Sequence, residues 1–147
     1  MSYIVDTNIF NQLIDGSVAI SDLPSDSLFF ATHVQIDEIN NTKDSERRAQ
    51  LFFMFVELKT ERVPTESFVF DISRFDLSKL SDGVLFGKLK HDLDMLNKSK
   101  SNNPQDVLIA EVAIMNGYTL ITADRDLADV VEKHGGKIIY TGKKNEK

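Results

Sequence analysis

The sequence predicts an α/β fold, a three-layer α/β/α sandwich with a central, mainly parallel sheet. Short segments rich in β-branched and aromatic residues alternate along the chain with longer segments whose apolar residues recur at helical spacing. Right-handed crossover helices then cover both faces of a parallel sheet. The 147 residues are 41% hydrophobic, enough to bury roughly two-thirds of the unfolded surface. We expect a single domain over residues 1–142 and a polar tail over residues 143–147.

Five short segments are expected to form strands, because each is β-branched or aromatic and too brief for an independent helix. In chain order they lie at residues 3–5, 27–31, 68–70, 118–121 and 138–140. The third falls within residues 61–82, a region that mixes turn-forming and apolar residues. Its pattern is the least regular in the chain.

Helical segments are expected after each of the first two strands, and two later ones carry clear start signals. Thr32 and Gln35 match a capping box. Asn103 is suited to cap a helix whose first position is Pro104 and which ends before Gly117. Beyond the helix that follows the first strand, helices are expected over residues 32–41, 44–60, 84–97, 104–116 and 126–133.

The composition limits the kinds of partner and chemistry. With 23 acidic and 17 basic residues the net charge is -6, which argues against broad adhesion to nucleic acid, so any such contact must be local. The absence of cysteine excludes thiolate metal sites and fits a reducing cytoplasm. No apolar run approaches the roughly 20 residues that span a bilayer, so we expect a cytoplasmic protein without a membrane anchor.

Four carboxylates stand where the ligands of a parallel sheet collect, beyond the carboxyl ends of the strands. Asp6 ends the first strand, Asp124 follows the strand at residues 118–121, and Asp106 lies in the first turn of its helix. Glu38 lies one helical turn after an apolar residue and can point inward. Clustered carboxylates repel unless a cation lies between them. Mg²⁺ or Mn²⁺ suits such oxygen ligands and can serve phosphodiester hydrolysis.

Four segments, in order over nearly the whole chain, carry a family resemblance. Residues 4–8 (IVDTN) resemble the opening strand motif of PIN-domain nucleases, and residues 36–39 (IDEI) resemble the glutamate helix of that family. Residues 106–111 (DVLIAE) are similar to its D-x-x-I-A helix. Residues 120–127 (LITADRDL) are similar to its L-I-T-x-D-x-D segment. The ordered set is far more specific than any one segment.

The resemblance implies a divalent-metal-dependent endoribonuclease that hydrolyses RNA with Mg²⁺ or Mn²⁺, similar to the toxins of VapBC-type toxin–antitoxin pairs. Such relatives form homodimers and are inhibited by an antitoxin protein. The residues that match the family's catalytic and metal-binding positions are Asp6, Glu38, Asp106 and Asp124, with Asp126 assisting through water and with Asn8 and Thr122 as supporting polar groups.

Plainer roles exist for each of these residues. Asp106 could favour the positive end of its helix, Asp6 and Asp124 could be ordinary N-caps, and Glu38 could be solvated. A non-catalytic PIN-like binding module for nucleic acid or protein is the alternative function. A phosphatase with an aspartate nucleophile is disfavoured, because Asn8 stands where an acidic partner is needed.

The remaining candidates are expected to be structural. The three histidines need no catalytic role, and the aromatic cluster is better suited to a core or a dimer face than to base stacking, because no basic residues interleave with it. Two basic groups could contact phosphate, although such patches are more often solvated. These sets are His33, His91 and His134; Phe52, Phe53 and Phe55; Lys43, Arg47 and Arg48; and Lys98 and Lys100.

Overall fold

A computed structural model describes residues 1–24, 27–66 and 83–142. Its centre is a five-stranded, all-parallel sheet with the order β3-β2-β1-β4-β5. The strands are β1 (Ser2–Val5), β2 (Leu28–Ala31), β3 (Glu61–Arg62), β4 (Thr119–Thr122) and β5 (Lys137–Tyr140). The chain builds outward from β1 on one side and then returns to add β4 on the other, so the strand order reverses between β1 and β4. Ligand sites of open α/β sheets form at such a reversal.

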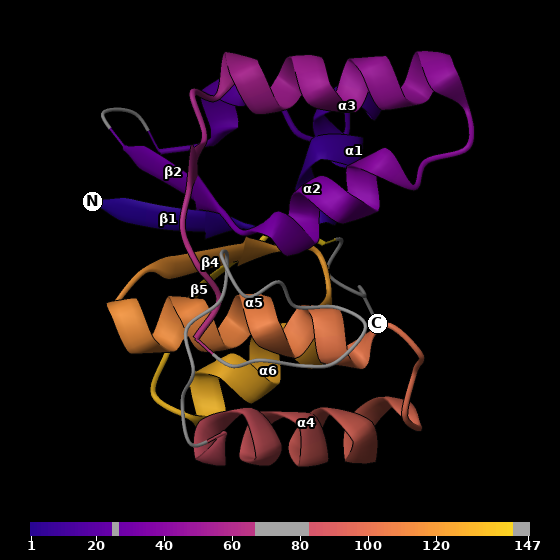
Figure 1. The fold of residues 1–147 in the computed structure, drawn as a ribbon. Helices are drawn as coiled ribbons and strands as arrows, with labels where there is room; N and C mark the ends of the chain where they lie inside the picture. Colours follow the sequence, from indigo (N-terminus) through magenta and orange to yellow (C-terminus); the bar gives the residue numbers. More distant parts are fainter. Residues whose placement is uncertain (25–26, 67–82, 143–147) are drawn as a thin grey trace, which may run out of the picture.

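Helices cover both faces of the sheet (Figure 1). They are α1 (Thr7–Asp15), α2 (His33–Asn40), α3 (Ser45–Glu57), α4 (Val84–Asn97), α5 (Asn103–Asn116) and α6 (Arg125–Lys133), with a 3₁₀ turn η1 at Ile20–Asp22. Figure 1 shows α1 and α3 on one side of the sheet and α4, α5 and α6 on the other. The predicted three-layer α/β/α sandwich is confirmed.

Each face of the sheet has its own hydrophobic core. Successive side chains of a strand point to opposite faces, so Ile4 packs with α4, α5 and α6 while Tyr3 and Val5 pack with α1 and α3. Helix α2 contributes to both cores, with Val34 on one side and Ile39 on the other. It therefore lies where the two layers meet at the sheet edge.

The predicted elements and the structure differ in two places. The two-residue strand β3 pairs with β2 and lacks any periodicity that a sequence pattern could reveal. The strand expected at residues 68–70 lies outside the described residues. Asn103 was expected to cap α5, but that prediction is wrong: Asn102 holds the N-cap position and Asn103 is already helical. Within the described ranges, no helix is both long and apolar enough to span a membrane.

Candidate acidic site

The carboxyl ends of β1 and β4 bring two predicted site residues together. Asp6 directly follows β1, and its backbone N–H donates to the carbonyl oxygen of Ile121 in β4 at 2.9 Å. Asp124 follows β4 after one intervening residue. The short connections hold both residues at the point where the strand order reverses.

The hydroxyl of Thr122 links these two aspartates. Thr122 is fully buried, and its Oγ1 donates to Asp6 Oδ2 at 2.8 Å. The same oxygen accepts from the backbone N–H of Asp124 at 3.0 Å. Asn8 adds a longer contact, because its Oδ1 accepts from the backbone N–H of Ala123 at 3.4 Å. Thr122 and Asn8 therefore fix the local conformation around the acidic side chains.

Two plainer roles can be compared with the observed hydrogen bonds. Asp124 does cap α6, because its Oδ1 accepts from the backbone N–H of Leu127 at 3.2 Å. Asp6 occupies the N-cap position of α1, but its side chain makes no capping hydrogen bond. The side chain of Asp6 is thus directed to Thr122, in the interior, and its burial needs another explanation.

Three of the carboxyl groups have strongly raised pKa values. Burial is the largest cause in each case, because it penalises the charged form. It raises the pKa of Asp6 to about 6, against the lowering effect of the Thr122 hydrogen bond. It raises the pKa of Glu38 to about 7, with a further rise from the charge of Asp6.

Asp106 is the most perturbed of the three. Its pKa rises to about 8 through burial, and then through the charges of Asp6 and Glu38. The charge of Asp124 adds a smaller rise, while Lys100 lowers the value. Asp6 and Asp106 therefore each lie within electrostatic range of the other predicted carboxylates, which the sequence could only suggest.

Glu38 has an oxygen whose burial is not compensated. The Thr7 hydroxyl lowers the pKa of Glu38, yet Glu38 Oε1 and Thr7 Oγ1 are both buried without a hydrogen bond of standard geometry among the described residues. Buried polar atoms are normally paired. An uncompensated carboxylate oxygen inside an acidic cluster is suited to a cation.

The carboxylates have the chemistry of a Mg²⁺ or Mn²⁺ site, since both ions prefer oxygen ligands. In the described part of the chain, however, no three acidic or histidine side chains converge closely enough to hold a metal. Asp126 is partly exposed in the first turn of α6 and is not among the charges that shift the three pKa values. The oxygen donors of these carboxylates are therefore of the kind that a hard divalent cation prefers.

Two neighbours of the acidic cluster were not predicted to belong to it. Asn102 Nδ2 donates to Asp106 Oδ2 at 3.4 Å, and Lys100 acts on the charge of Asp106. Both lie on the connection between α4 and α5. The four-residue spacing of Asn102 and Asp106 was a usable signal, whereas the position of Lys100 depends on the course of the loop.

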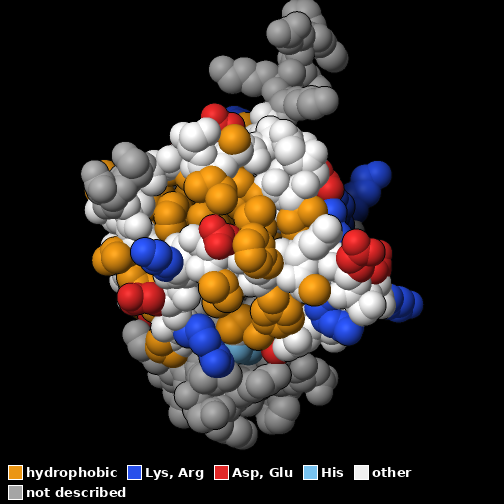
Figure 2. Space-filling model, turned by 90° about the horizontal axis from the view of Figure 1, so that it is seen from above, with side chains coloured by type: hydrophobic (Ala, Val, Ile, Leu, Met, Phe, Trp, Pro, Cys, Tyr) orange, Lys and Arg blue, Asp and Glu red, His pale blue; other side chains and the backbone are white. Residues whose placement is uncertain are grey.

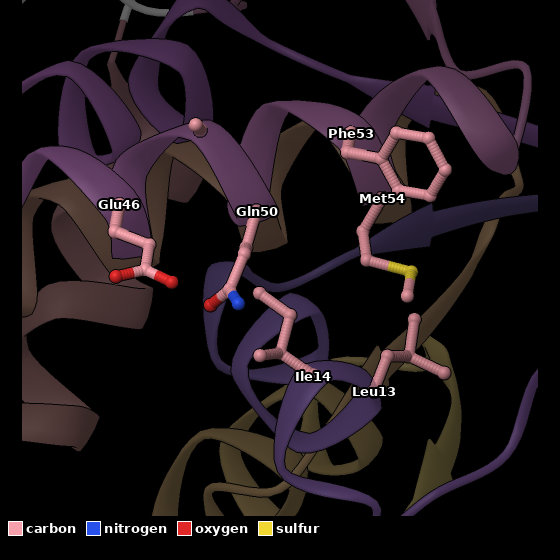
Figure 3. Close-up of a pocket in the computed structure, with 7 residues that line it drawn as sticks. Leu13, Ile14, Glu46, Gln50, Phe53 and Met54 are labelled. Atoms are coloured by element: carbon pink, nitrogen blue, oxygen red, sulfur yellow. The ribbon is translucent and has the colours of Figure 1, made fainter.

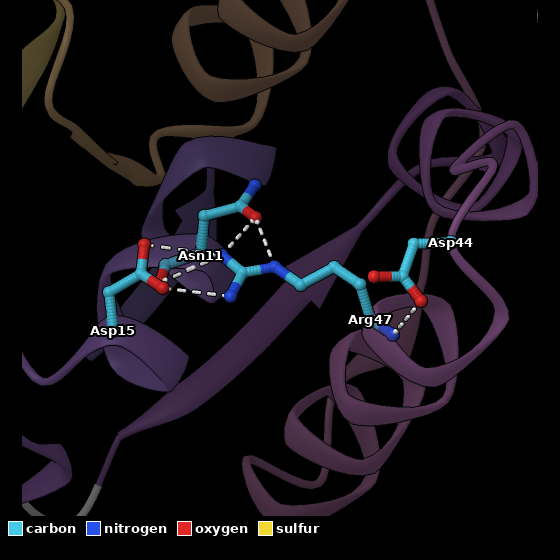
Figure 4. A network of polar contacts seen from close by, with 4 residues as sticks. All are labelled: Asn11, Asp15, Asp44 and Arg47. Atoms are coloured by element: carbon cyan, nitrogen blue, oxygen red, sulfur yellow. Dashed lines mark hydrogen bonds and ion pairs between the residues drawn. The ribbon is translucent and has the colours of Figure 1, made fainter.

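Arg47 is committed to contacts within the protein (Figure 4). Its Nη1 donates to Asp15 Oδ1 at 2.7 Å, and its Nη2 donates to Asn11 Oδ1 at 2.7 Å. The hydrogen bond from Arg47 also holds the pKa of Asp15 below its usual range. Asp44 caps the helix that carries Arg47. The network joins α1 to α3, so this guanidinium is not free for phosphate.

An apolar face lies over α3. Figure 2 shows hydrophobic side chains gathered on this side of the molecule, and Phe53 and Val56 of α3 are largely exposed. A groove of about 460 Å³ runs between α1 and α3, where Leu13, Ile14 and Met54 meet (Figure 3). None of the four predicted carboxylates lines it. The groove is therefore a surface separate from the acidic site.

Comparison with known proteins supports the fold. No protein-family model matches the sequence, and no curated protein matches it. Solved structures do match over almost the whole chain. The VapBC2 structure from Rickettsia felis, bound to a DNA fragment from its promoter, aligns with a TM-score of 0.60 at 18% identity, covering 95% of this chain and 98% of the other.

Two further structures have the same architecture. The VapBC-1 structure from nontypeable Haemophilus influenzae aligns with a TM-score of 0.56 at 15% identity, covering 96% of this chain and 98% of the other. A domain of a functionally unknown protein from Methanocaldococcus jannaschii gives 0.53 at 15%, covering 99% and 94%. At these identities the likeness shows a shared fold, in agreement with the PIN-like architecture expected from the sequence.

Proposed function

We propose that this protein is a divalent-metal-dependent endoribonuclease of the PIN type. The observation that carries the proposal is the set of three carboxyl groups with raised pKa values, Asp6, Glu38 and Asp106, at the strand reversal between β1 and β4. Perturbed groups gathered at a ligand-binding edge are a mark of functional sites. Three acids that repel one another would destabilise a purely structural core, so their clustering indicates a functional site.

The four carboxylates Asp6, Glu38, Asp106 and Asp124 would hold Mg²⁺ or Mn²⁺, with Asp126 assisting through water. When bound, such an ion polarises a phosphoryl oxygen and lowers the pKa of an attacking water. The protein's own contribution is orientation, because Thr122 fixes Asp6 and the start of the Asp124 segment. These carboxyl groups must lose their protons before they bind a cation, so the affinity of the site for the cation should rise with pH.

Glu38 is suited to bind the cation. Its pKa is raised to about 7 in the metal-free protein, and a bound cation would favour the ionised form. Its Oε1 is buried without a hydrogen bond of standard geometry among the described residues, although the Thr7 hydroxyl is near enough to lower its pKa. We infer that this oxygen is one of the cation's ligands.

The proposal extends to the toxin of a toxin–antitoxin pair. Its support is the shared fold with the two VapBC structures and the resemblance of the four sequence segments. The homodimer and the antitoxin stay predictions. The apolar face over α3, with Phe53 and Val56 exposed, is a surface on which a partner protein could bury area. Light scattering of the purified chain measures whether it dimerises.

A second candidate is a PIN-like binding module without turnover. The observation in its favour is that, among the described residues, no three acidic or histidine side chains reach metal-ligand spacing. This candidate predicts RNA or protein binding that neither Mn²⁺ nor loss of a carboxylate changes.

Cleavage of a panel of single-stranded and structured RNAs tests the proposal. Each RNA is incubated with Mn²⁺, Mg²⁺ or EDTA and with wild type, Asp6→Asn or the control Asp129→Asn. Asp129 is an exposed acid that pairs with Arg125 at 3.1 Å. The nuclease predicts cleavage that requires metal, is lost in Asp6→Asn and persists in Asp129→Asn. Cleavage that survives in Asp6→Asn would refute the site, and well-folded protein that cuts no RNA would favour the binding module.

A further inference from the structure

An acidic nuclease needs local cations to hold a polyanionic substrate, and some of the twelve lysine and arginine side chains among the described residues are already paired. Four of them have carboxylate partners within ion-pair distance: Arg47 with Asp15, Lys90 with Asp94, Arg125 with Asp129, and Lys133 with Asp92. A lysine or arginine that binds phosphate is therefore expected among those without a carboxylate partner in the described part of the chain, at a position near the acidic site.

The loop between α4 and α5 carries such residues to that site. Figure 1 shows this connection on the same side of the sheet as the carboxyl ends of the strands. It contains Lys98 and Lys100, both exposed, and leads directly into the first turn of α5, which holds Asp106. The loop is therefore one wall of the approach to the carboxylates.

The loop is held in place by a buried amide. Asn103 has no exposed surface, and its Nδ2 donates to Asp94 Oδ1 at 2.7 Å and to Asn97 Oδ1 at 2.8 Å. Asn97 Nδ2 returns a hydrogen bond to Asn103 Oδ1 at 2.9 Å. Lys90, on the preceding turn of α4, neutralises Asp94. This network ties both ends of the loop together.

The loop backbone has an uncommon conformation. Lys98 and Ser99 have φ values of 59° and 58°, in the left-handed region that residues other than glycine rarely adopt. The N–H of Ser99 donates to the carbonyl oxygen of Asp94 at 3.2 Å, and the N–H of Asn103 donates to that of Lys100 at 3.1 Å. The backbone position of Lys100 is thus determined by the surrounding contacts.

Lys100 lies at the rim of the acidic site. Of the charges that act on Asp106, it is the one that favours the ionised form. Next to it, the Asn102 amide donates to Asp106 Oδ2. A lysine is a compact cation that binds phosphate oxygens. Its charge acts on Asp106, while its exposure leaves the ammonium group accessible.

We propose that Lys100, positioned by the loop that Asn103 anchors, binds an RNA phosphate next to the phosphodiester held at the acidic site. This inference rests on the proposed function, because it assigns a substrate contact to that site. The competing role is purely structural: Lys100 could only offset the negative charge of the carboxylates. The two roles differ in whether RNA affinity depends on the residue.

Binding of a short fluorescein-labelled single-stranded RNA tests the proposal by anisotropy, in EDTA and in Ca²⁺, so that the result does not require cleavage. The variants are Lys100→Gln, Lys100→Arg and the control Lys137→Gln, an exposed residue at the opposite end of the strands. We expect Lys100→Gln to weaken binding several-fold and to reduce the salt dependence, the slope of log K against log salt, by about one. Lys100→Arg and Lys137→Gln should bind like wild type.

The other outcomes distinguish the phosphate-binding role of Lys100 from the structural role. RNA affinity unchanged in Lys100→Gln, or absent in wild type, would overturn the proposal. A change in melting temperature with unchanged RNA affinity would assign Lys100 the structural role. Failure of the proposed function is distinguishable, because it appears as RNA binding by wild type without metal-dependent cleavage. If wild type cleaves, Lys100→Gln should raise KM more than it lowers kcat.

Discussion

Replacing Asp106 with asparagine is expected to stabilise the metal-free protein at neutral pH. Burial and the charges of Asp6 and Glu38 are the largest causes that raise the pKa of Asp106 from 3.8 to about 8. At about pH 7.5 the unfolded chain ionises this group while the folded protein keeps it protonated, a mismatch of about 3.5 pKa units. At about 1.4 kcal/mol per unit, the cost to folding is at most about 5 kcal/mol. Asparagine has the shape of the protonated acid and avoids this cost.

The expected gain is smaller than this limit, because the neighbouring carboxyl groups share the effect and readjust when one of them is removed. A gain of about 2 kcal/mol corresponds to a rise of about 6 °C in Tm for a chain of this size. The folded pKa lies above the unfolded one, so the cost is absent below the unfolded pKa and grows as pH rises towards the folded value. The gain should therefore shrink to about a fifth near pH 4.5.

Thermal unfolding followed by circular dichroism in EDTA, at about pH 4.5, 6 and 7.5, measures this pH dependence. Asp129→Asn is the matched control, because it removes an exposed acid whose partner is Arg125; no gain that grows with pH is expected from it. An Asp106→Asn protein that is less stable than wild type near neutral pH would refute the reasoning. A gain of equal size at every pH would also refute it, because the cost of keeping Asp106 protonated in the folded protein would then not be the cause.

Three further changes test the contacts around the site. Thr122→Val removes the hydroxyl that links Asp6 to the backbone of Asp124; the free energy of unfolding in urea should fall by about 2 kcal/mol, and Thr122→Ser should restore most of it. Asp92→Asn should lower Tm at neutral pH, because hydrogen bonds from His134 and Lys133 hold the pKa of Asp92 below its usual range. That deficit should disappear as pH falls through this lowered pKa, and a constant deficit would contradict it. Asn103→Ala should increase amide hydrogen exchange in the loop between α4 and α5, whereas unchanged exchange there would show that the amide network does not hold the loop.

Much of the fold follows from local patterns. The capping box of Thr32 and Gln35 is present in the structure, and the helix expected at residues 84–97 is α4 with the same bounds. The buried, β-branched strands at the centre of the sheet were also predictable, because a strand covered on both faces is a continuous apolar run. Strand β3 was not, since two residues carry no period and the strand exists only through its pairing with β2.

The sequence by itself determined which acidic residues stand at strand ends and helix starts, because position along the chain decides where each element begins. The strand order, decided by tertiary pairing, brings Asp6 beside Asp124 and puts Asp106 in range of both. The raised pKa values also depend on the strand order, because it buries these side chains and brings together charges about a hundred positions apart in the sequence. The same reason explains Asn103: its local pattern suited an N-cap, but hydrogen bonds to Asp94 and Asn97 are available only after α4 packs beside α5.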